Sequence, residues 1–367
     1  MSITQGIIRL AMIAGLAGGV SSACTVPVFR YALDHWPGDP YRLEAPEEWM
    51  TGEAATSLLE LLEKTGTEVR IQPLEDAGAP ARLLLPRKGS VVWSGTLDET
   101  AGNLFISPVR QELAQRILSG ESMVWIMVTS GDEEADRILE ERMTERLDYL
   151  QSVAAIPEQD PNDPDSKLGP GPELRVGFSF LKVAHDDPRE QVFLRMLAGP
   201  ESELLNENPD TGKREPFGGV VFGRGRVLGA WPSSSLDDEG LDEVSLFLLG
   251  ACSCRVKVQN PGWDLALAVD WDEALQDAQM QADRNSSEET AGARPGRNDG
   301  GTADAEPRVE VVRMDSEQDD IALPSNPNAG FLKAHPAAGP LIGGLVALAG
   351  VLALCCALGS VSGVKGS

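Results

Sequence analysis

The chain has 367 residues and carries 57 aspartates and glutamates against 31 lysines and arginines, a formal net charge of −26. A surface this acidic repels phosphate backbones, which disfavours nucleic acid as a partner. Hydrophobic residues make up 42% of the chain, so the residues up to about position 270 can form a core for two domains of ordinary size.

Residues 1–23 have the pattern of a signal peptide. Arg9 precedes an apolar stretch at 10–20, and Ser21-Ser22-Ala23 offers the small residues that signal peptidase accepts. Cleavage after Ala23 leaves Cys24 as the first residue, a position that also suits lipid attachment, although such signals usually have Leu where this chain has Ser21. An uncleaved anchor is the third alternative.

Residues 339–359 form a second apolar stretch, without a charged residue. At about 1.5 Å per residue it can cross a hydrocarbon core of about 30 Å, which predicts a transmembrane helix rather than a buried core helix. Residues 360–367 then form a cytoplasmic stub, and Lys365 agrees with the positive-inside tendency. The predicted topology is a single-pass protein of the bacterial cell envelope with its body outside the cytoplasm.

Gly343, Ala347 and Gly350 are spaced near three and four residues apart in this predicted span. Small residues at that spacing let two helices approach closely, so self-association through these three positions is possible. Glycine-rich spans also occur without dimers.

Local patterns between residues 24 and 156 predict a first α/β domain. The run VPVFRYAL has strand-like β-branched and aromatic content, and Ser107-Pro108 resembles a helix start. The predicted elements are a strand at 26–33, a helix at 54–64, strands at 68–72, 81–85 and 90–94, a helix at 108–118, a buried strand at 123–128 and a long helix at 133–153.

A polar segment rich in Pro and Asp, residues 157–172, predicts a linker to a second α/β domain at 173–275. There we expect a strand at 174–183, a helix at 189–197, a hairpin at 218–231, a helix at 236–249 and a strand at 265–269. Both halves run through similar elements, which suggests divergent copies of one unit. Residues 276–338 are acidic, with hardly an aromatic residue, and predict a disordered stalk.

Within the second half, the stretch PFGGVVFGRGR at 216–226 resembles the thioredoxin-like segment in which a proline precedes a hairpin that is followed by a helix. The resemblance implies two tandem thioredoxin-like domains. Thioredoxin chemistry needs Cys-x-x-Cys at the first strand-to-helix turn. The turns expected at 37–40 and 184–187 contain no cysteine, so the resemblance extends to the fold and not to dithiol catalysis.

The opening CTVPVFRYALDHWPGDPY, together with Cys-Ser-Cys and the tetrapeptide Gln-Asn-Pro-Gly at 259–262, also resembles a group of exported proteins of planctomycete-type bacteria. This resemblance implies export and no particular activity.

Three cysteines lie outside the predicted span: Cys24, Cys252 and Cys254. On a strand, alternation puts Cys252 and Cys254 on one face, where the two sulfurs suit a soft metal such as Cu(I) or exchange with Cys24. The alternatives are two packed small side chains or a structural disulfide with Cys24. Two thiol ligands alone do not make a zinc site.

Arg30, Asp34, His35 and Trp36 form a second candidate cluster. On the strand predicted there, Asp34 and Trp36 share one face and His35 the other. The cluster then either lines a functional cleft or forms a sheet edge with a salt bridge and an aromatic anchor.

Two functions remain. The first is a membrane-anchored binding or scaffold module without enzymatic activity or cofactor, whose envelope partner the sequence does not name. The second is a thiol-disulfide or copper-handling protein that uses Cys252 and Cys254 with Cys24 as a third sulfur.

Overall fold

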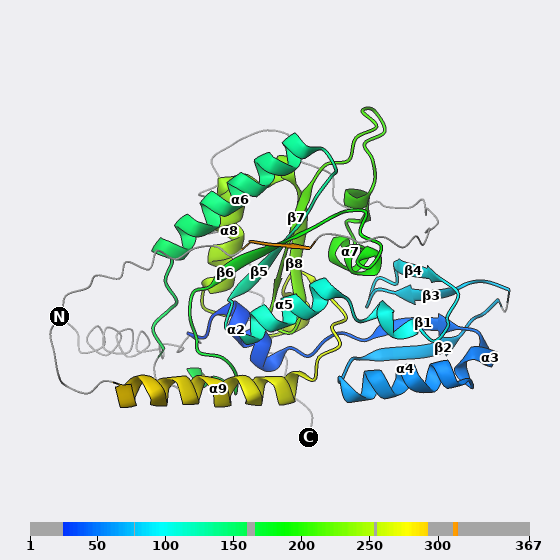
Figure 1. The fold of residues 1–367 in the computed structure, drawn as a ribbon, viewed down its shortest axis with the longest axis horizontal. Coiled ribbons are helices and arrows are strands. Elements are labelled where there is room, and N and C mark those ends of the chain that lie inside the picture. The colour runs from blue at the N-terminus through cyan, green and yellow to red at the C-terminus, as the bar shows by residue number, and fades with distance from the viewer. Residues whose placement is uncertain (1–24, 77, 160–165, 253–254, 293–310, 315–367) are drawn as a thin grey trace, which may run out of the picture.

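The computed structural model describes residues 25–76, 78–159, 166–252, 255–292 and 311–314, with the side chains described up to residue 285. It shows a mixed α/β protein with two sheets (Figure 1). The predicted signal peptide, transmembrane helix and cytoplasmic stub, and most of the predicted stalk, lie outside these residues. Within them, no helix has both the length and the apolarity needed to span a membrane.

The first sheet has four strands in the order β2-β1-β3-β4. Its strands are β1 (Tyr41–Ala45), β2 (Val69–Pro73), β3 (Ala81–Leu84) and β4 (Val91–Gly95). β1 pairs in parallel with β2 and antiparallel with β3, which forms a hairpin with β4. The helices α3 (Glu47–Met50) and α4 (Glu53–Lys64) connect β1 to β2, and α5 (Pro108–Leu118) follows the hairpin.

The second sheet has the order β10-β6-β5-β7-β8-β9. Its strands are β5 (Met123–Val128), β6 (Phe178–Val183), β7 (Phe217–Phe222), β8 (Arg226–Pro232), β9 (Trp263–Asp264) and β10 (Val311–Met314). The helices α6 (Glu133–Val153), α7 (Gln191–Ala198) and α8 (Asp238–Leu249) connect or follow these strands, and α9 (Trp271–Gly292) comes after β9. Residues 276–292 of α9 and the strand β10 fall within the stalk predicted to be disordered, so that prediction is wrong for these residues.

Four strands of each sheet share one plan. β5 pairs in parallel with β6 and antiparallel with β7, and β7 pairs antiparallel with β8. The order β6-β5-β7-β8 therefore repeats both the order and the strand directions of β2-β1-β3-β4. The main difference is the second connection, which contains α7 in the second unit and no helix in the first.

Strand pairing crosses the linker predicted at 157–172. β5 comes before this segment, yet it lies between β6 and β7, which come after it. Trp125 is opposite Phe180 on one side and Val220 on the other. The six-stranded sheet is therefore built from both halves of the predicted division, and the change from one four-strand plan to the next falls between α5 and β5.

Side-chain alternation along β5 divides the core into two layers. All six residues of β5 are buried. Met123, Trp125 and Met127 pack in the cluster that contains residues of α6 and α8, whereas Val124 and Ile126 pack in the cluster that contains α5 and α7. The first sheet contributes to this second cluster, so one apolar core is continuous between the two sheets.

The helix starts predicted at 108 and 133 are confirmed, whereas α8 begins two residues after its predicted start at 236. Ser107 accepts a hydrogen bond from the Arg110 N–H at the start of α5, and Pro108 occupies the first turn. Asp132 accepts from the Ala135 N–H at the start of α6. Asp237 accepts from the Gly240 N–H at the start of α8. Each cap satisfies an amide that has no partner within the helix.

The strand predicted at 26–33 is wrong, because residues 28–35 form the helix α2 (Val28–His35). Its buried apolar residues are Val28, Phe29, Ala32 and Leu33. They are spaced three and four positions apart, which places them on one face of a helix. Val28, Phe29 and Ala32 pack in the cluster that contains residues of α8, whereas Leu33 packs in the other core cluster. The strand predicted at 265–269 is also wrong: these residues are mostly buried but form no strand, and β9, just before them, pairs with β8.

Candidate functional site

Of the three candidate cysteines, the structure describes Cys252 alone; Cys24 and Cys254 lie outside the described residues. Cys252 is 3% exposed and packs in the core cluster beside α2 and α8. Its backbone N–H donates to the Val26 carbonyl at 2.8 Å, next to an antiparallel bridge between Pro27 and Ala251. The chain two residues after Cys24 therefore contacts Cys252 directly, and the pairing of the sulfurs stays a prediction.

Arg30 and Asp34 form a buried ion pair on α2. Arg30 Nε lies 3.0 Å from Asp34 Oδ1, and the two side chains are 3% and 2% exposed. Arg30 also donates to the carbonyls of Gly169 and Pro172, both at 2.6 Å, and Asp34 accepts from the Gly169 N–H at 2.9 Å. The pair therefore fixes the end of the predicted linker against the body.

His35 and Trp36 do not complete a surface cluster with this pair. Trp36 is 4% exposed, its Nε1 donates to the Arg255 carbonyl at 3.2 Å, and the Arg226 guanidinium lies 5.6 Å from its ring. His35 is exposed and packs on Tyr31. The predicted alternation is wrong because the segment is helical, where positions four apart share a face.

A buried charge network that the sequence did not indicate lies next to Trp36. Arg226 Nη1 donates to Asp264 Oδ1 at 2.9 Å, and both side chains are 3% exposed. Lys257 contacts the other oxygen of Asp264 and also Asp39. The Tyr41 hydroxyl donates to the Asp264 carbonyl at 2.8 Å, and burial raises the pKa of this hydroxyl well above its usual range.

The network joins two segments that lie more than 200 residues apart in the chain. Arg226 Nη2 donates to the carbonyls of Asn260, Pro261 and Gly262 at 3.0 to 3.2 Å, and the Asp39 N–H donates to Asp264 at 2.7 Å. The opening segment and the Gln-Asn-Pro-Gly tetrapeptide therefore meet through one guanidinium and one carboxylate. Their role here is structural, because every polar group in the network has a protein partner.

The turns between strand and helix differ from those expected at 37–40 and 184–187. The first strand-to-helix connection of the second sheet runs from Thr129 to Asp132, between β5 and α6, and contains no cysteine. Asp136 Oδ1 accepts from both the N–H and the hydroxyl of Ser130, and its Oδ2 accepts from the Gly131 N–H. The Asp136 side chain therefore lies against the turn that leads into α6 and satisfies two of its backbone N–H groups.

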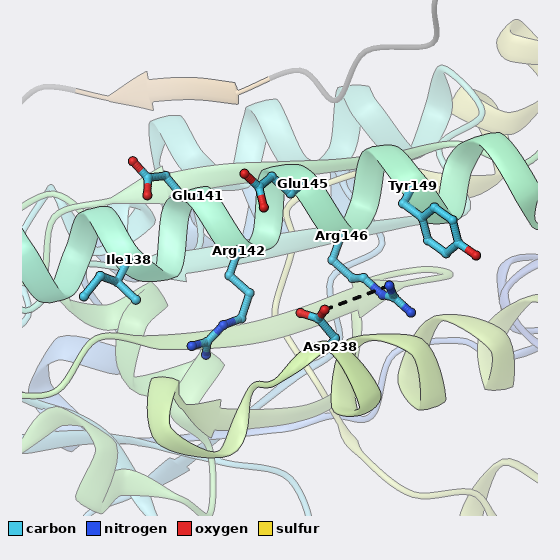
Figure 2. A pocket seen from close by; sticks show the side chains of 7 residues that line it. All are labelled: Ile138, Glu141, Arg142, Glu145, Arg146, Tyr149 and Asp238. Carbon is cyan, nitrogen blue, oxygen red and sulfur yellow. Dashed lines mark ion pairs between the residues drawn. The ribbon is translucent and has the colours of Figure 1, made fainter.

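A groove of about 530 Å³ lies between α6 and α8 (Figure 2). Arg142 and Arg146 point from α6 toward α8, where Arg146 faces Asp238 (Figure 2). Arg142 donates to the Leu236 carbonyl at 2.7 Å, and the Arg146 guanidinium makes a two-point contact with the Asp242 carboxylate. The groove is lined by Ile138, Glu141, Arg142, Glu145, Arg146, Tyr149 and Asp238.

Two large side chains along this groove are open to solvent. Ile138 is 44% exposed and Tyr149 is 51% exposed, with the Arg146 guanidinium 4.7 Å from the Tyr149 ring. Val153, on the next turn of α6, is 57% exposed, and Leu246 on α8 is 53% exposed. The groove thus combines fixed arginines with apolar surface, a composition typical of protein contacts.

In the part of the chain that the structure describes, no three His, Cys, Asp or Glu side chains are placed to hold a metal ion. No protein-family model matches the chain, and no curated protein matches it.

Proposed function

We propose that this chain is a membrane-anchored binding or scaffold module of the bacterial cell envelope, built from two thioredoxin-like α/β units. A leader, an acidic stalk and a terminal apolar span would hold the body on the outer side of a membrane. At about 5 to 6 Å times the square root of its length, a flexible stalk of the roughly 24 residues between β10 and the apolar span, 315–338, gives a reach of about 25 to 30 Å.

The strand plan supports the two-unit architecture. In a thioredoxin-like unit, a parallel strand pair connected by a helix is extended by an antiparallel hairpin, and the order β6-β5-β7-β8 has this form. The order β2-β1-β3-β4 has it too. The units that we propose therefore run from β1 to α5 and from β5 to α8, with a boundary earlier than the linker suggested.

One observation favours a binding function over dithiol catalysis. A dithiol enzyme of this fold would have its reactive cysteine in the turn between β5 and α6, and here a structural carboxylate lies against that turn instead. The Asp136 carboxylate accepts hydrogen bonds from the backbone N–H groups of Ser130 and Gly131. A helix amino end lowers a thiol pKa only when a thiol stands there. The groove between α6 and α8 is the surface that we assign to an envelope protein.

The groove can be tested by photo-cross-linking in cells. A photoreactive residue at Ile138 or Tyr149 should give one adduct of defined mass with an envelope protein. The same residue at Leu59 on α4 is the matched control, because Leu59 is 50% exposed and lies outside the groove. The proposal fails if the groove positions give no adduct, or the same adducts as position 59.

Membrane attachment needs a separate test. Fractionation should recover the protein with membranes, and protease added outside the cytoplasmic membrane should degrade the body. The intact mass of the mature protein distinguishes the fates of Cys24, because lipid adds mass and a disulfide removes two hydrogens. Recovery as a soluble cytosolic protein with residues 1–23 intact would overturn both the anchor and the export.

The second candidate function is thiol-disulfide or copper handling, and the contact between Val26 and Cys252 favours it. Val26 is two positions after Cys24, with Thr25 between them, so this function would pair the sulfur of Cys24 with that of Cys252. Thiol labelling of the native protein with and without reductant tests this function. It is lost if Cys24, Cys252 and Cys254 all resist labelling after reduction.

A further inference from the structure

A second cavity, of about 370 Å³, lies at the edge of the four-stranded sheet where β1 and β2 begin and the β3–β4 turn folds over. Its size is near the lower end for small-molecule sites. The lining residues come from three segments: Asp39, Pro40, Tyr41 and Arg42, then Arg70 and Gln72, then Leu85, Pro86, Arg87 and Gly89. Three of them are arginines, in a chain whose net charge is −26.

The sheet itself brings two of these arginines together. Arg42 and Arg70 are direct partners in the parallel pairing of β1 with β2, so their side chains leave the same face. On β1, Tyr41 and Leu43 are buried against the core, which places Arg42 on the opposite, open face. Arg42 remains 43% exposed and Arg70 is exposed.

The third arginine is held by an unusual turn. Arg87 has a φ of 63°, and it is the one described residue other than glycine with a positive φ. Such a backbone is uncommon for a residue with a side chain. Its Nη2 lies 2.7 Å from Asp39 Oδ2, on the rim of the cavity, and the side chain is 43% exposed.

Around the cavity, positively charged side chains outnumber the carboxylates with which they pair. Glu44 is shared between Arg42 and Arg82, and Asp39 is shared between Arg87 and Lys257. Arg70 has no ion pair or hydrogen bond among the residues that the structure describes. Four cations around two carboxylates, with Arg70 in addition, leave three positive charges in excess, of which a dianion would neutralise two.

We infer that this cavity binds a small phosphate-bearing molecule through Arg42, Arg70 and Arg87. Guanidinium groups pair with phosphate through two parallel N–H···O bonds, and a phosphate offers oxygens in several directions. A planar carboxylate offers two. Three arginines that enter from two strands and one turn therefore suit phosphate better than carboxylate. This inference is independent of the α6–α8 groove, so failure of either proposal leaves the other standing.

Calorimetric titration of the purified full chain with inorganic phosphate, at fixed ionic strength, tests the site. Fixed salt matters because exposed charges are screened. We expect saturable binding of phosphate and at least tenfold weaker binding of malonate, a dicarboxylate of similar charge. Absence of saturable binding, or equal affinity for malonate, would overturn the phosphate assignment.

Arg70→Ala should weaken phosphate binding about tenfold or more, because it removes a charge-assisted contact to the phosphate; tenfold corresponds to about 1.4 kcal/mol. Arg70→Lys should recover part of the affinity, because it restores the charge without the planar fork. Arg137→Ala removes an exposed charge on α6 and should leave the affinity unchanged. Equal loss in the Arg70 and Arg137 variants would show a general charge effect and contradict the site.

A second experiment distinguishes a lipid headgroup from a soluble phosphate as the ligand. Vesicles of phosphatidylcholine with phosphatidic acid should bind the protein in an Arg70-dependent manner if a lipid headgroup is the ligand. If free phosphate binds but these vesicles do not, the ligand is a soluble phosphate. Both results presuppose saturable binding of inorganic phosphate, and the phosphate assignment fails without that binding.

Discussion

Arg30 and Asp34 show how a pair of charged residues can be structural rather than functional. Both side chains are almost fully buried, and all the contacts described for them are to each other and to the backbone at 169–172. A buried pair of this kind is often neutral when replaced as a whole, but removing one partner leaves an isolated charge in the core.

We therefore expect Asp34→Asn to lower the free energy of unfolding by about 3 to 5 kcal/mol, measured by urea denaturation. Glu141→Gln removes one partner of an exposed pair with Arg137, and should scarcely move the unfolding midpoint. Similar midpoints for the two variants would contradict the structural role of the buried pair.

Glu190 gives the protein a pH dependence that can be isolated. Burial raises the pKa of its carboxyl above the ordinary value of 4.5, although hydrogen bonds from Ser107 and the Val109 N–H act to lower it. The folded state therefore holds this proton more tightly than the unfolded state. Its contribution to stability is present below pH 4.5 and is lost as the pH rises through the raised pKa.

Glu190→Gln should remove this component, because the amide oxygen still accepts from Val109 but does not ionise. We expect the stability of the wild type, relative to this variant, to fall as the pH is raised above 4.5 and through the raised pKa of Glu190. Urea unfolding of both proteins across this range provides the measurement. A difference that stays constant with pH would show that Glu190 is not responsible.

Among the elements, the loop at 257–262 is the one on which most of the buried charge network depends. Its carbonyls surround the Arg226 guanidinium, and Gly262 makes the turn with a φ of 104°. A Cβ at this position would lie 2.1 Å from the Val227 carbonyl oxygen, which a change of rotamer cannot relieve.

Gly262→Ala should therefore destabilise the protein by more than about 1 kcal/mol and loosen the contact between β8 and β9. Gly38→Ala is a matched control in the segment on the other side of the network, because no atom lies within 4 Å of a Cβ there and φ is not positive. Thermal unfolding compares them; a smaller loss for Gly262→Ala than for Gly38→Ala would contradict the described loop.

At the scale of the whole molecule, β5 makes the body one cooperative unit. It lies in the interior of the six-stranded sheet, and its two neighbours come from the other side of residues 157–172. α2, at the amino end of the described chain, packs in the same core cluster. Neither the residues before 157 nor those after 172 contain all the elements that pack against β5.

We expect a fragment of residues 25–156, expressed alone, to show no cooperative unfolding transition, because β5 would expose six buried side chains. A fragment of residues 173–275 should behave in the same way. The body of residues 25–292 should unfold in a single transition by circular dichroism. A sharp transition in fragment 25–156 would show that the halves are independent.

Much of the secondary structure was predictable because its signals are local. The starts of α5 and α6, the buried strand β5 and the β7–β8 hairpin all follow from caps, periodicity and turn glycines within a few residues. The segment at 26–33 misled because its β-branched and aromatic content outweighed the helical spacing of Val28, Ala32 and Trp36. The candidate site fared less well, since Arg30 and Asp34 proved buried and the paired arginines of β1 and β2 gave no sequence signal.

The sequence by itself determined the acidic charge, most of the helices and strands, and the lack of a cysteine at the β5–α6 turn. Only the tertiary structure decided that β5 joins both halves, that Arg226 and Asp264 are buried together, and that Arg42 meets Arg70. Strand neighbours and ion pairs depend on residues tens to hundreds of positions apart, and loop closure over such distances leaves no trace in a local pattern.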